Sequence, residues 1–352
     1  MEETRIKEGK ILLEKYITDI NSKYPYSQTG FYITLFTDEK VLIDVGNTKD
    51  LMYIASIAKI CFALYMLEYF EEHKISLESK MNKYSIDTYF VNQSTKRILK
   101  NEIVDFFVQE FLERININDF NKIKDLLERN IKNTNNLIEE EKKILVNEFN
   151  SIISEKPSFT FNELFDLMLG SSSNCALSVL IENIDVKNIH DSVQKRMDKI
   201  LGIASLLTIN NSYKEGKTKG WTIASLCEIC KVFRIFVEKV KMDYPSLLSA
   251  LRISGNTDIE LISRVRNSYG KGGWYTSFPL KQEGFKQEAM ESKYTWQDYD
   301  FVTMFCDLTY IPQRDVLVSY HVAIPHTEKD QGKEIIKSEG NKVLDMLESF
   351  LT

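Results

Sequence analysis

The order of helical and strand-like segments predicts an α/β fold of the α+β type, with one antiparallel sheet built from both ends of the chain. Two observations carry this prediction. Apolar and β-branched strand signals lie near the N-terminus and return only after about residue 270. The long stretch between them is helical in pattern. The simplest closure is a sheet flanked by the two terminal helices, plus an all-helical lobe inserted in the middle of the chain.

The N-terminal elements follow from simple patterns. Residues 3–22 place apolar side chains at helical spacing, which predicts an amphipathic helix. Two β-like runs follow, Phe31–Phe36 and Val41–Val45, joined by a polar Thr-Asp-Glu-Lys stretch that is typical of a hairpin. A strongly apolar helix is expected from about Ser56 to Glu72. These elements supply the first outer helix, two strands and the start of the helical lobe.

The middle of the chain differs in composition from the rest. Residues 85–156 are rich in Asn, Lys, Glu and Ile and contain neither Gly nor Pro. We interpret this segment as a helical insertion, with predicted helices over 97–115, 118–132 and 136–153. The first has a broad apolar face and should therefore pack against another surface.

Further helices are predicted over 161–169, 174–183 and 222–237, and a last one over about 330–350. Three late segments are apolar or β-branched and are separated by turn-like residues, which predicts the strands Gly272–Ser277, Phe301–Thr309 and Val316–Ile324. We therefore expect a single domain over 1–352 in two lobes. The sheet lobe comprises 1–50 and 260–352, and the helical lobe comprises 51–259.

Composition restricts the partners. The chain has 352 residues and a formal net charge of −6, which argues against nucleic acid as the main partner. The most apolar run, Ile54–Leu67, contains Lys59 and is too short to cross a bilayer, so no membrane partner is expected. The N-terminus mixes charges and lacks the pattern of a signal peptide, which predicts a cytoplasmic protein unless a leader has been removed.

Cysteine and histidine patterns give little support for a metal or cofactor. The five cysteines are scattered among apolar neighbours and are interpreted as reduced. Cys227 and Cys230 form a CxxC inside a helical pattern, which favours core packing over a zinc or redox site. The four histidines lie far apart and show no HxxxH or HExxH spacing. No GxSxG elbow is present, although a Ser-His-Asp triad stays open.

Ser56 and Lys59 form the first of three short motifs that could carry chemistry. A serine and a lysine three apart at a helix start share one face. Backbone N–H groups there favour developing negative charge, and a lysine one turn on can take the hydroxyl proton. The SxxK pattern also occurs at Ser192 and Ser268, and the alternative for Ser56 is a simple helix N-cap.

Two further motifs follow in order. Ser172-Ser173-Asn174 lies between two predicted helices, where a hydroxyl and an amide two residues apart can face one cleft. The alternative is again an N-cap. Lys271-Gly272-Gly273 enters a predicted edge strand, where a cation beside glycines lets a substrate backbone approach closely. The alternative is a hairpin turn with a solvated lysine.

In this order and context, the three motifs resemble the SxxK, SxN and KTG signature of the serine β-lactamases and penicillin-binding proteins. The resemblance covers about 5–84 and 157–350. It implies a β-lactamase/transpeptidase-like fold with Ser56 as nucleophile and Lys59 as base. It further implies that Ser172 relays a proton to the leaving nitrogen, Asn174 bonds a substrate amide, and Lys271 orients the relay and attracts a substrate anion. The backbone N–H groups of Ser56 and Trp274, which follows Gly273, would form the oxyanion hole.

Three departures from the family pattern stand out. The stretch between Ser56 and Ser172 is longer than is usual for the family, because it contains 85–156. The middle residue of the third motif is Gly272, where the family's hydroxyl helps to hold a substrate carboxylate. No segment like the E-P-x-x-N loop that carries the deacylating Glu of class A enzymes follows Asn183, and Glu215 there is interpreted as a solvated turn residue.

The sequence therefore predicts a β-lactamase-like serine hydrolase or acyltransferase that needs no cofactor and acts on a small-molecule or peptide-like amide, lactam or ester. The resemblance implies a serine hydrolase similar to class A β-lactamases or D-alanyl-D-alanine peptidases. Two alternatives stay open. One is a non-catalytic or sensor-like binding module of the same fold, and the other is an unrelated helical protein in which all three motifs are caps and turns.

Overall fold

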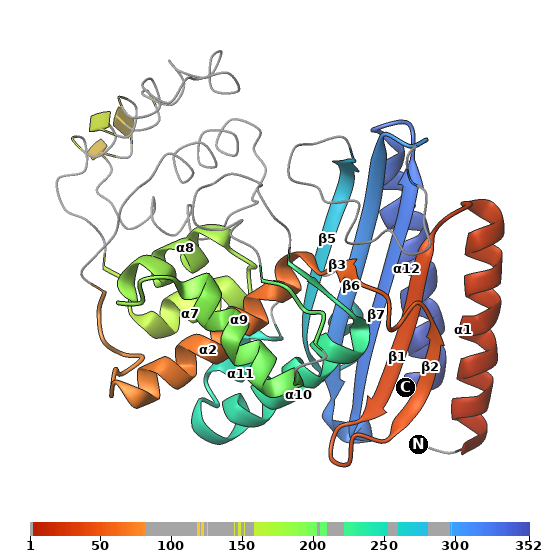
Figure 1. The fold of residues 1–352 in the computed structure, drawn as a ribbon, viewed down its shortest axis with the longest axis horizontal. Coiled ribbons are helices and arrows are strands. Elements are labelled where there is room, and N and C mark those ends of the chain that lie inside the picture. The colour runs from red at the N-terminus through yellow and green to blue at the C-terminus, as the bar shows by residue number, and fades with distance from the viewer. Residues whose placement is uncertain are drawn as a thin grey trace. The chain divides into compact units, whose positions relative to one another are not determined.

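The computed structural model describes residues 3–81, 158–202, 205–209, 222–252, 260–280, 296 and 298–352, with single residues or pairs between 118 and 151 (Figure 1). The chain divides into two compact units. The first comprises residues 1–68, 188–212 and 218–352, and we call it the sheet unit. The second comprises residues 69–187 and 213–217, and we call it the helical unit.

A five-stranded antiparallel sheet forms the centre of the sheet unit, with the strand order β2-β1-β7-β6-β5. Strand β1, from the N-terminal part of the chain, pairs with β7 from the C-terminal part, and Gly30 lies opposite His321. Figure 1 shows this closure as orange-red β1 beside blue β7. The predicted fold class is therefore confirmed. The strands are β1 (Gln28–Leu35), β2 (Val41–Gly46), β5 (Tyr269–Pro279), β6 (Phe301–Ile311) and β7 (Val316–His326).

The two terminal helices cover one face of this sheet. Helix α1 spans Glu3–Lys23, with an acidic residue in its first turn and a basic residue in its last, as the helix dipole favours. Helix α12 spans Gln331–Leu351. Apolar side chains of both helices share one buried cluster with the sheet, including Leu13, Tyr16, Phe31, Val318, Tyr320, Val343 and Leu347. Burial of this surface is the main force that holds the helices to the sheet.

Helix α10, Leu226–Asp243, contacts β1 and β7. It begins at a capping box, in which the Ser225 hydroxyl accepts from the Glu228 N–H and the Glu228 carboxylate accepts from the Ser225 N–H. Helix α9, Ile189–Leu201, packs on α10 and was not expected from the sequence. Its signal was present, because Ile189, Val193 and Met197 are buried at i, i+4 and i+8.

The shorter elements of the sheet unit lead into and out of these layers. Strand β3 (Met52–Tyr53) pairs with β4 (Ile223–Ala224), just before the turn that carries Ser56. Helix α11 (Leu247–Ala250) and two 3-10 turns, η3 (Leu261–Ser263) and η5 (Pro312–Arg314), complete the described connections. None of the helices in the described parts of the chain is long and apolar enough to span a bilayer.

The helical unit contains the two helices that flank the second motif. Helix α7 (Phe161–Leu169) starts at a capping box formed by Thr160 and Glu163, and α8 (Asn174–Asn183) follows it after a short turn. Phe70 packs against Phe161 with 4.6 Å between ring centroids. Both helices have the predicted bounds. The predicted insertion 85–156 lies almost entirely outside the described residues, apart from isolated helical positions.

Candidate active site

Ser56 lies on a tight turn that runs directly into a long apolar helix. The turn is η1, Ala55–Ala58, and helix α2 continues from Lys59 to Glu72. Ala55 has a φ of 46°, a left-handed conformation that is costly for a residue with a side chain. The N-cap of the turn is Ile54, so Ser56 is not the N-cap that the alternative interpretation required. The predicted helix from Ser56 differs only in its first turn, which is 3-10.

The side chains of the first motif are in direct contact. The Lys59 Nζ donates a hydrogen bond of 2.9 Å to the Ser56 Oγ. Lys59 is fully buried, at 0% exposure. A nucleophile and a base within this distance satisfy the geometric requirement for proton transfer. The one-turn spacing in the sequence therefore becomes a real contact, because three residues along a helical turn bring two side chains to the same face.

The third motif lies on β5, which is the edge strand of the sheet beside the Ser56 turn. A Cβ added to Gly273 would lie 2.9 Å from both the Ser56 N atom and the Ala55 Cβ. Only a glycine allows the strand backbone to approach the turn this closely. The side chain of the next residue, Trp274, packs against the core under the terminal helices. Any contribution of Trp274 to an oxyanion hole would therefore come from its backbone.

Lys271 is not the solvated lysine that the alternative interpretation described. Its side chain is 1% exposed, and its Nζ donates a hydrogen bond of 3.2 Å to the Gly272 carbonyl. Burial lowers the pKa of Lys271 below its usual range, and the nearby carboxyls of Glu260 and Asp307 oppose this shift. A buried amine requires such partners, because an isolated charge in the interior is very costly.

Glu260 is a residue of this motif region that sequence reasoning missed. It immediately precedes η3, and it is 1% exposed. A Cβ added to Gly272 would lie 2.5 Å from the Glu260 carboxyl carbon. The Glu260 side chain thus fills the space that a side chain at position 272 would need. Nothing in the sequence around Glu260 marks it, since only the fold brings it to the strand.

Asp307 is the second missed carboxyl. It lies directly opposite Gly272 in the β5–β6 register and is 1% exposed. Its Oδ2 accepts hydrogen bonds from the Leu261 N–H at 2.8 Å and from the Thr309 hydroxyl at 3.0 Å. Burial raises the pKa of Asp307 to about 6 and that of Glu260 to about 8. A lone Asp within the apolar strand Phe301–Ile311 was the available signal, because a charge there must be paired.

The second motif lies in the helical unit, between α7 and α8. Ser173 is the N-cap of α8, and its Oγ accepts from the Ala176 N–H at 3.1 Å. Ser172 precedes this cap and has a left-handed φ of 58°. Asn174 is the first residue of α8. The N-cap interpretation therefore applies to Ser173 and not to Ser172. The approach of Ser172 and Asn174 to Ser56 stays a prediction.

The described residues around these motifs include no candidate metal centre. Within the described parts of the chain, no three His, Cys, Asp or Glu side chains gather at a spacing that would hold an ion. The described cysteines, Cys61, Cys227, Cys230 and Cys306, are all free. Burial raises the pKa of both Cys61 and Cys230 to about 12, which keeps them as inert thiols at neutral pH.

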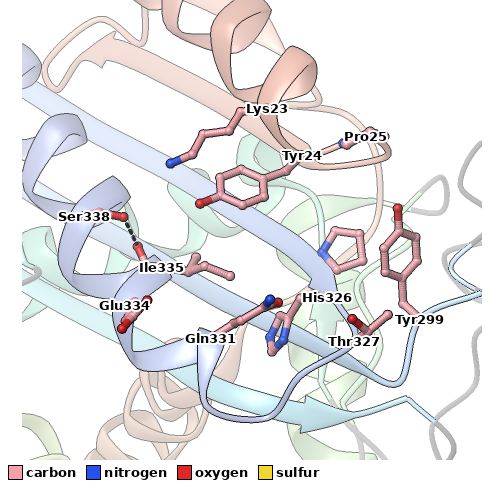
Figure 2. Close-up of a pocket in the computed structure, with 11 residues that line it drawn as sticks. Lys23, Tyr24, Pro25, Tyr299, His326, Thr327, Gln331, Glu334, Ile335 and Ser338 are labelled. Carbon is pink, nitrogen blue, oxygen red and sulfur yellow. Dashed lines mark hydrogen bonds between the residues drawn. The ribbon is translucent and has the colours of Figure 1, made fainter.

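A separate hollow lies at the far end of β7, where α12 begins (Figure 2). It has a volume of about 480 Å³ and is lined by Lys23, Tyr24, Tyr299, His326, Gln331 and Glu334, among others. Lys23 is ion-paired with Glu339 at 2.8 Å, and the His326 ring hydrogen-bonds with the Thr303 hydroxyl at 2.8 Å. The first interaction joins α1 to α12, and the second joins β6 to β7.

Comparisons with known proteins agree with the fold. Residues 12–96 match the model of the beta-lactamase enzyme family. No curated protein sequence matches the chain. A class A β-lactamase from Bacteroides cellulosilyticus is 12% identical with a TM-score of 0.55, over 97% of this chain and 99% of that one.

Two further solved structures are similar over nearly the full length. TLA-3 extended-spectrum β-lactamase is 12% identical with a TM-score of 0.56, over 96% of this chain and 99% of that one. An acyl-enzyme complex of a PBP-A mutant with penicillin G is 12% identical with a TM-score of 0.51, over 96% of each chain. The chain thus has the fold of the serine β-lactamases and penicillin-binding proteins, and the resemblance inferred from its three motifs is confirmed at the level of fold.

Proposed function

We propose that this protein is a serine hydrolase or acyltransferase of the penicillin-recognising type, which forms an acyl-enzyme on Ser56 with an amide, lactam or ester. The observation that carries the proposal is the 2.9 Å hydrogen bond between the Lys59 Nζ and the Ser56 Oγ, beside an edge strand whose Gly273 packs on the Ser56 backbone. Acyl transfer needs a nucleophile, a base and N–H donors for the oxyanion, and an adjacent strand can supply one of these donors from its backbone. The similar fold of known β-lactamases and PBP-A supports the same reaction class.

The chemistry assigned to these residues runs in two stages. The Ser56 Oγ attacks the carbonyl carbon while its proton passes to the Lys59 amine, and the Ser56 and Trp274 N–H groups stabilise the oxyanion. The bond to the leaving atom then breaks. That atom leaves with a proton delivered through Ser172, and Ser56 remains as an ester. Attack of water or another acceptor on this ester releases the acyl group and restores the hydroxyl.

The second stage is proposed to be slow. A deacylating base is worth about 10²- to 10⁴-fold in rate, and the sequence offers no convincing one. Glu215, the remaining candidate from the sequence, lies outside the described residues. A β-lactam should therefore give a burst of acylation followed by a small steady-state rate.

Intact mass after incubation with a fluorophosphonate and with a fluorescent penicillin tests the proposal. We expect one covalent adduct, which is absent in Ser56→Ala and forms about 10²- to 10⁴-fold more slowly in Lys59→Ala. Ser192→Ala is the matched control, because Ser192 also begins an SxxK sequence but lies on α9, and it should be labelled normally. Absence of any adduct with both probes would contradict the proposal.

The second candidate function is a binding module that keeps the fold without turnover. Gly272 favours it, because the hydroxyl that the family uses at this position is missing. Such a protein would bind a ligand reversibly and leave the mass of the chain unchanged, whereas the enzyme would gain the mass of the acyl group.

A further inference from the structure

The Lys271 region differs chemically from the anion-attracting site that the sequence resemblance implies. Two carboxyls, Glu260 and Asp307, are buried beside Lys271, and each of the three side chains is 1% exposed. The charges of both carboxyls act on the Lys271 amine and oppose the lowering of its pKa by burial. Gly273 packs on the Ser56 backbone, and Lys271, two residues earlier on β5, leaves the strand on the same face. The two carboxyls lie at the intervening Gly272.

The Glu260 carboxyl fills the space of the missing side chain at position 272. A Cβ at Gly272 would lie 2.5 Å from the Glu260 Cγ and Cδ and 2.6 Å from Oε1. These distances are shorter than any ordinary contact, so the Glu260 side chain would have to move to admit a hydroxyl-bearing residue at position 272. Asp307 lies opposite Gly272 on the adjacent strand and is fixed by the Leu261 N–H and the Thr309 hydroxyl.

The three side chains of this cluster together carry no net positive charge. Lys271 contributes at most one positive charge. Asp307 is held as a carboxylate, because its Oδ2 accepts hydrogen bonds from the Leu261 N–H and the Thr309 hydroxyl, and Glu260 adds a second negative charge when it ionises. The net charge of the three groups at neutral pH is therefore zero or negative. A substrate carboxylate next to Lys271 would gain little attraction, because the two protein carboxyls already offset the charge of the lysine.

We propose that Glu260 and Asp307 determine substrate class at the Ser56 site, by restricting it to acyl donors that carry no carboxylate at the end facing Lys271. The inference rests on the proposed function, because it concerns the substrate of the same nucleophile. Two features act together. The cluster supplies no net attraction for an anion, and Gly272 supplies no hydroxyl to bond one. An uncharged end, such as a carboxamide or an ester, avoids the like-charge penalty.

A pair of thioesters that differ in one group tests this inference on the intact protein. Both have the same acyl group, and the leaving thiol is mercaptoacetate in one and mercaptoacetamide in the other. Each acylation rate is divided by the spontaneous hydrolysis rate of the same thioester. We expect the carboxamide to react at least about tenfold faster than the carboxylate. Equal rates, or a preference for the carboxylate, would overturn the inference.

Variants of Glu260 and Asp307 test whether these two carboxyls cause the preference for the carboxamide thioester. In the double variant Glu260→Gln/Asp307→Asn, the relative rate of the carboxylate thioester should rise about tenfold, because the negative charges that repel the substrate carboxylate are then absent. Asp307→Asn alone removes the carboxylate opposite Gly272 and should give about a threefold rise if the double variant does not fold. The control Glu328→Gln/Glu334→Gln removes two exposed charges of the same unit and should change the ratio less than about twofold.

Labelling by the fluorophosphonate separates the two proposals. If the fluorophosphonate labels Ser56 but the two thioesters react equally, only the substrate restriction is overturned. If neither the fluorophosphonate nor either thioester acylates Ser56, the proposed function fails and the restriction fails with it. A merely structural role for Glu260 would lower both thioester rates together and leave their ratio unchanged, which also overturns the inference.

Discussion

At the scale of single residues, surroundings decide what a given side chain can do. Lys59 and Lys271 are both buried lysines, with exposures of 0% and 1%. Lys59 donates to the Ser56 hydroxyl, whereas Lys271 donates to a backbone carbonyl beside two carboxyls. The first arrangement suits proton transfer to and from a nucleophile, and the second suits internal charge compensation. The same residue type therefore takes two different roles within one unit.

His321 gives a prediction about acid sensitivity. It lies on β7, fully buried, and burial lowers its pKa to about 3. The unfolded chain takes up this proton near pH 6.5, whereas the folded chain does so only near pH 3. Protonation therefore favours the unfolded state, and the folded state loses stability as pH falls from about 6.5 towards 3.

The variant His321→Leu should remove this part of the acid sensitivity. Between pH 7 and pH 5, the parent should lose about 2 kcal/mol more of its free energy of unfolding than the variant does. Urea unfolding at both pH values measures the difference. Parallel pH profiles for the two proteins would contradict the prediction, whatever the variant costs at neutral pH.

At the scale of elements, the backbone of the edge strand β5 packs directly on the turn that carries Ser56. Gly273 allows the strand to pack on the Ser56 turn, and the neighbouring Gly272 leaves room for Glu260. An edge strand has an unpaired side that can accept a substrate backbone, as in other cases of strand addition. The position of β5 relative to η1 is therefore the element-level feature on which the proposed acylation depends.

Gly273→Ala tests this dependence. The new Cβ would lie 2.9 Å from the Ser56 N atom and 3.2 Å from the Ile54 carbonyl oxygen, so the turn or the strand must shift. Displacing reacting groups by about 1 Å costs about 10²-fold in rate, so fluorophosphonate labelling should slow by roughly that factor. Gly270→Ala is the control, since its Cβ would crowd Thr309 and Leu308 on β6 instead.

The two glycine variants should separate stability from labelling. Both should lower the melting temperature, because each adds a carbon to a filled space. Only Gly273→Ala should slow labelling out of proportion to its loss of stability. Equal slowing in both variants would show that the contact between Gly273 and Ser56 has no special role in the reaction.

Elements differ in how well their sequences reveal them. Helices α7 and α8 have the predicted bounds because polar caps at Thr160 and Ser173 mark their starts. Helix α10 begins four residues later than expected, at Leu226, because β4 takes up Ile223–Ala224. Strand pairing with distant Met52–Tyr53 decides that boundary, and local propensity does not contain this information.

At the scale of the whole molecule, the two ends of the chain meet on one face of the sheet. Gly9 of α1 lies against Phe350 near the end of α12, and a Cβ on Gly9 would be 2.7 Å from the Phe350 ring. The ring is 5% exposed and has little room to move away. This contact joins residues from opposite ends of the sequence, so substitutions at both positions can test whether α1 and α12 pack together.

Gly9→Ala is predicted to destabilise this protein, although a Gly→Ala substitution normally stabilises a helix. In an isolated helix interior, Ala is about 0.5–1 kcal/mol more favourable than Gly. Here the clash with Phe350 should make the substitution destabilising, by about 1–3 kcal/mol. In the Phe350→Ala background the clash is absent, and the same substitution should become neutral or stabilising. Denaturant unfolding of the four proteins gives the coupling free energy, and additive effects would show that the helices do not meet there.

The sequence alone determined most of the elements, although not α9 or β4, and the contact between Ser56 and Lys59. Apolar periodicity placed both terminal helices and the strands, and a one-turn spacing placed Ser56 beside Lys59, because both are local properties of a chain segment. The predicted lobe boundaries, and the approach of Ser172 and Asn174 to Ser56, stay predictions.

Only the tertiary structure decided the character of the third motif. Glu260, Asp307 and Lys271 are separated along the chain. The pairing of β5 with β6 brings Asp307 close to Lys271, and the packing of η3 on both strands adds Glu260 to the buried cluster. Burial then sets their charges, because the cost of removing a charge from water depends on which other charges share the site. That environment is a property of the folded protein, so the two carboxyls near Lys271 could not be predicted from the sequence.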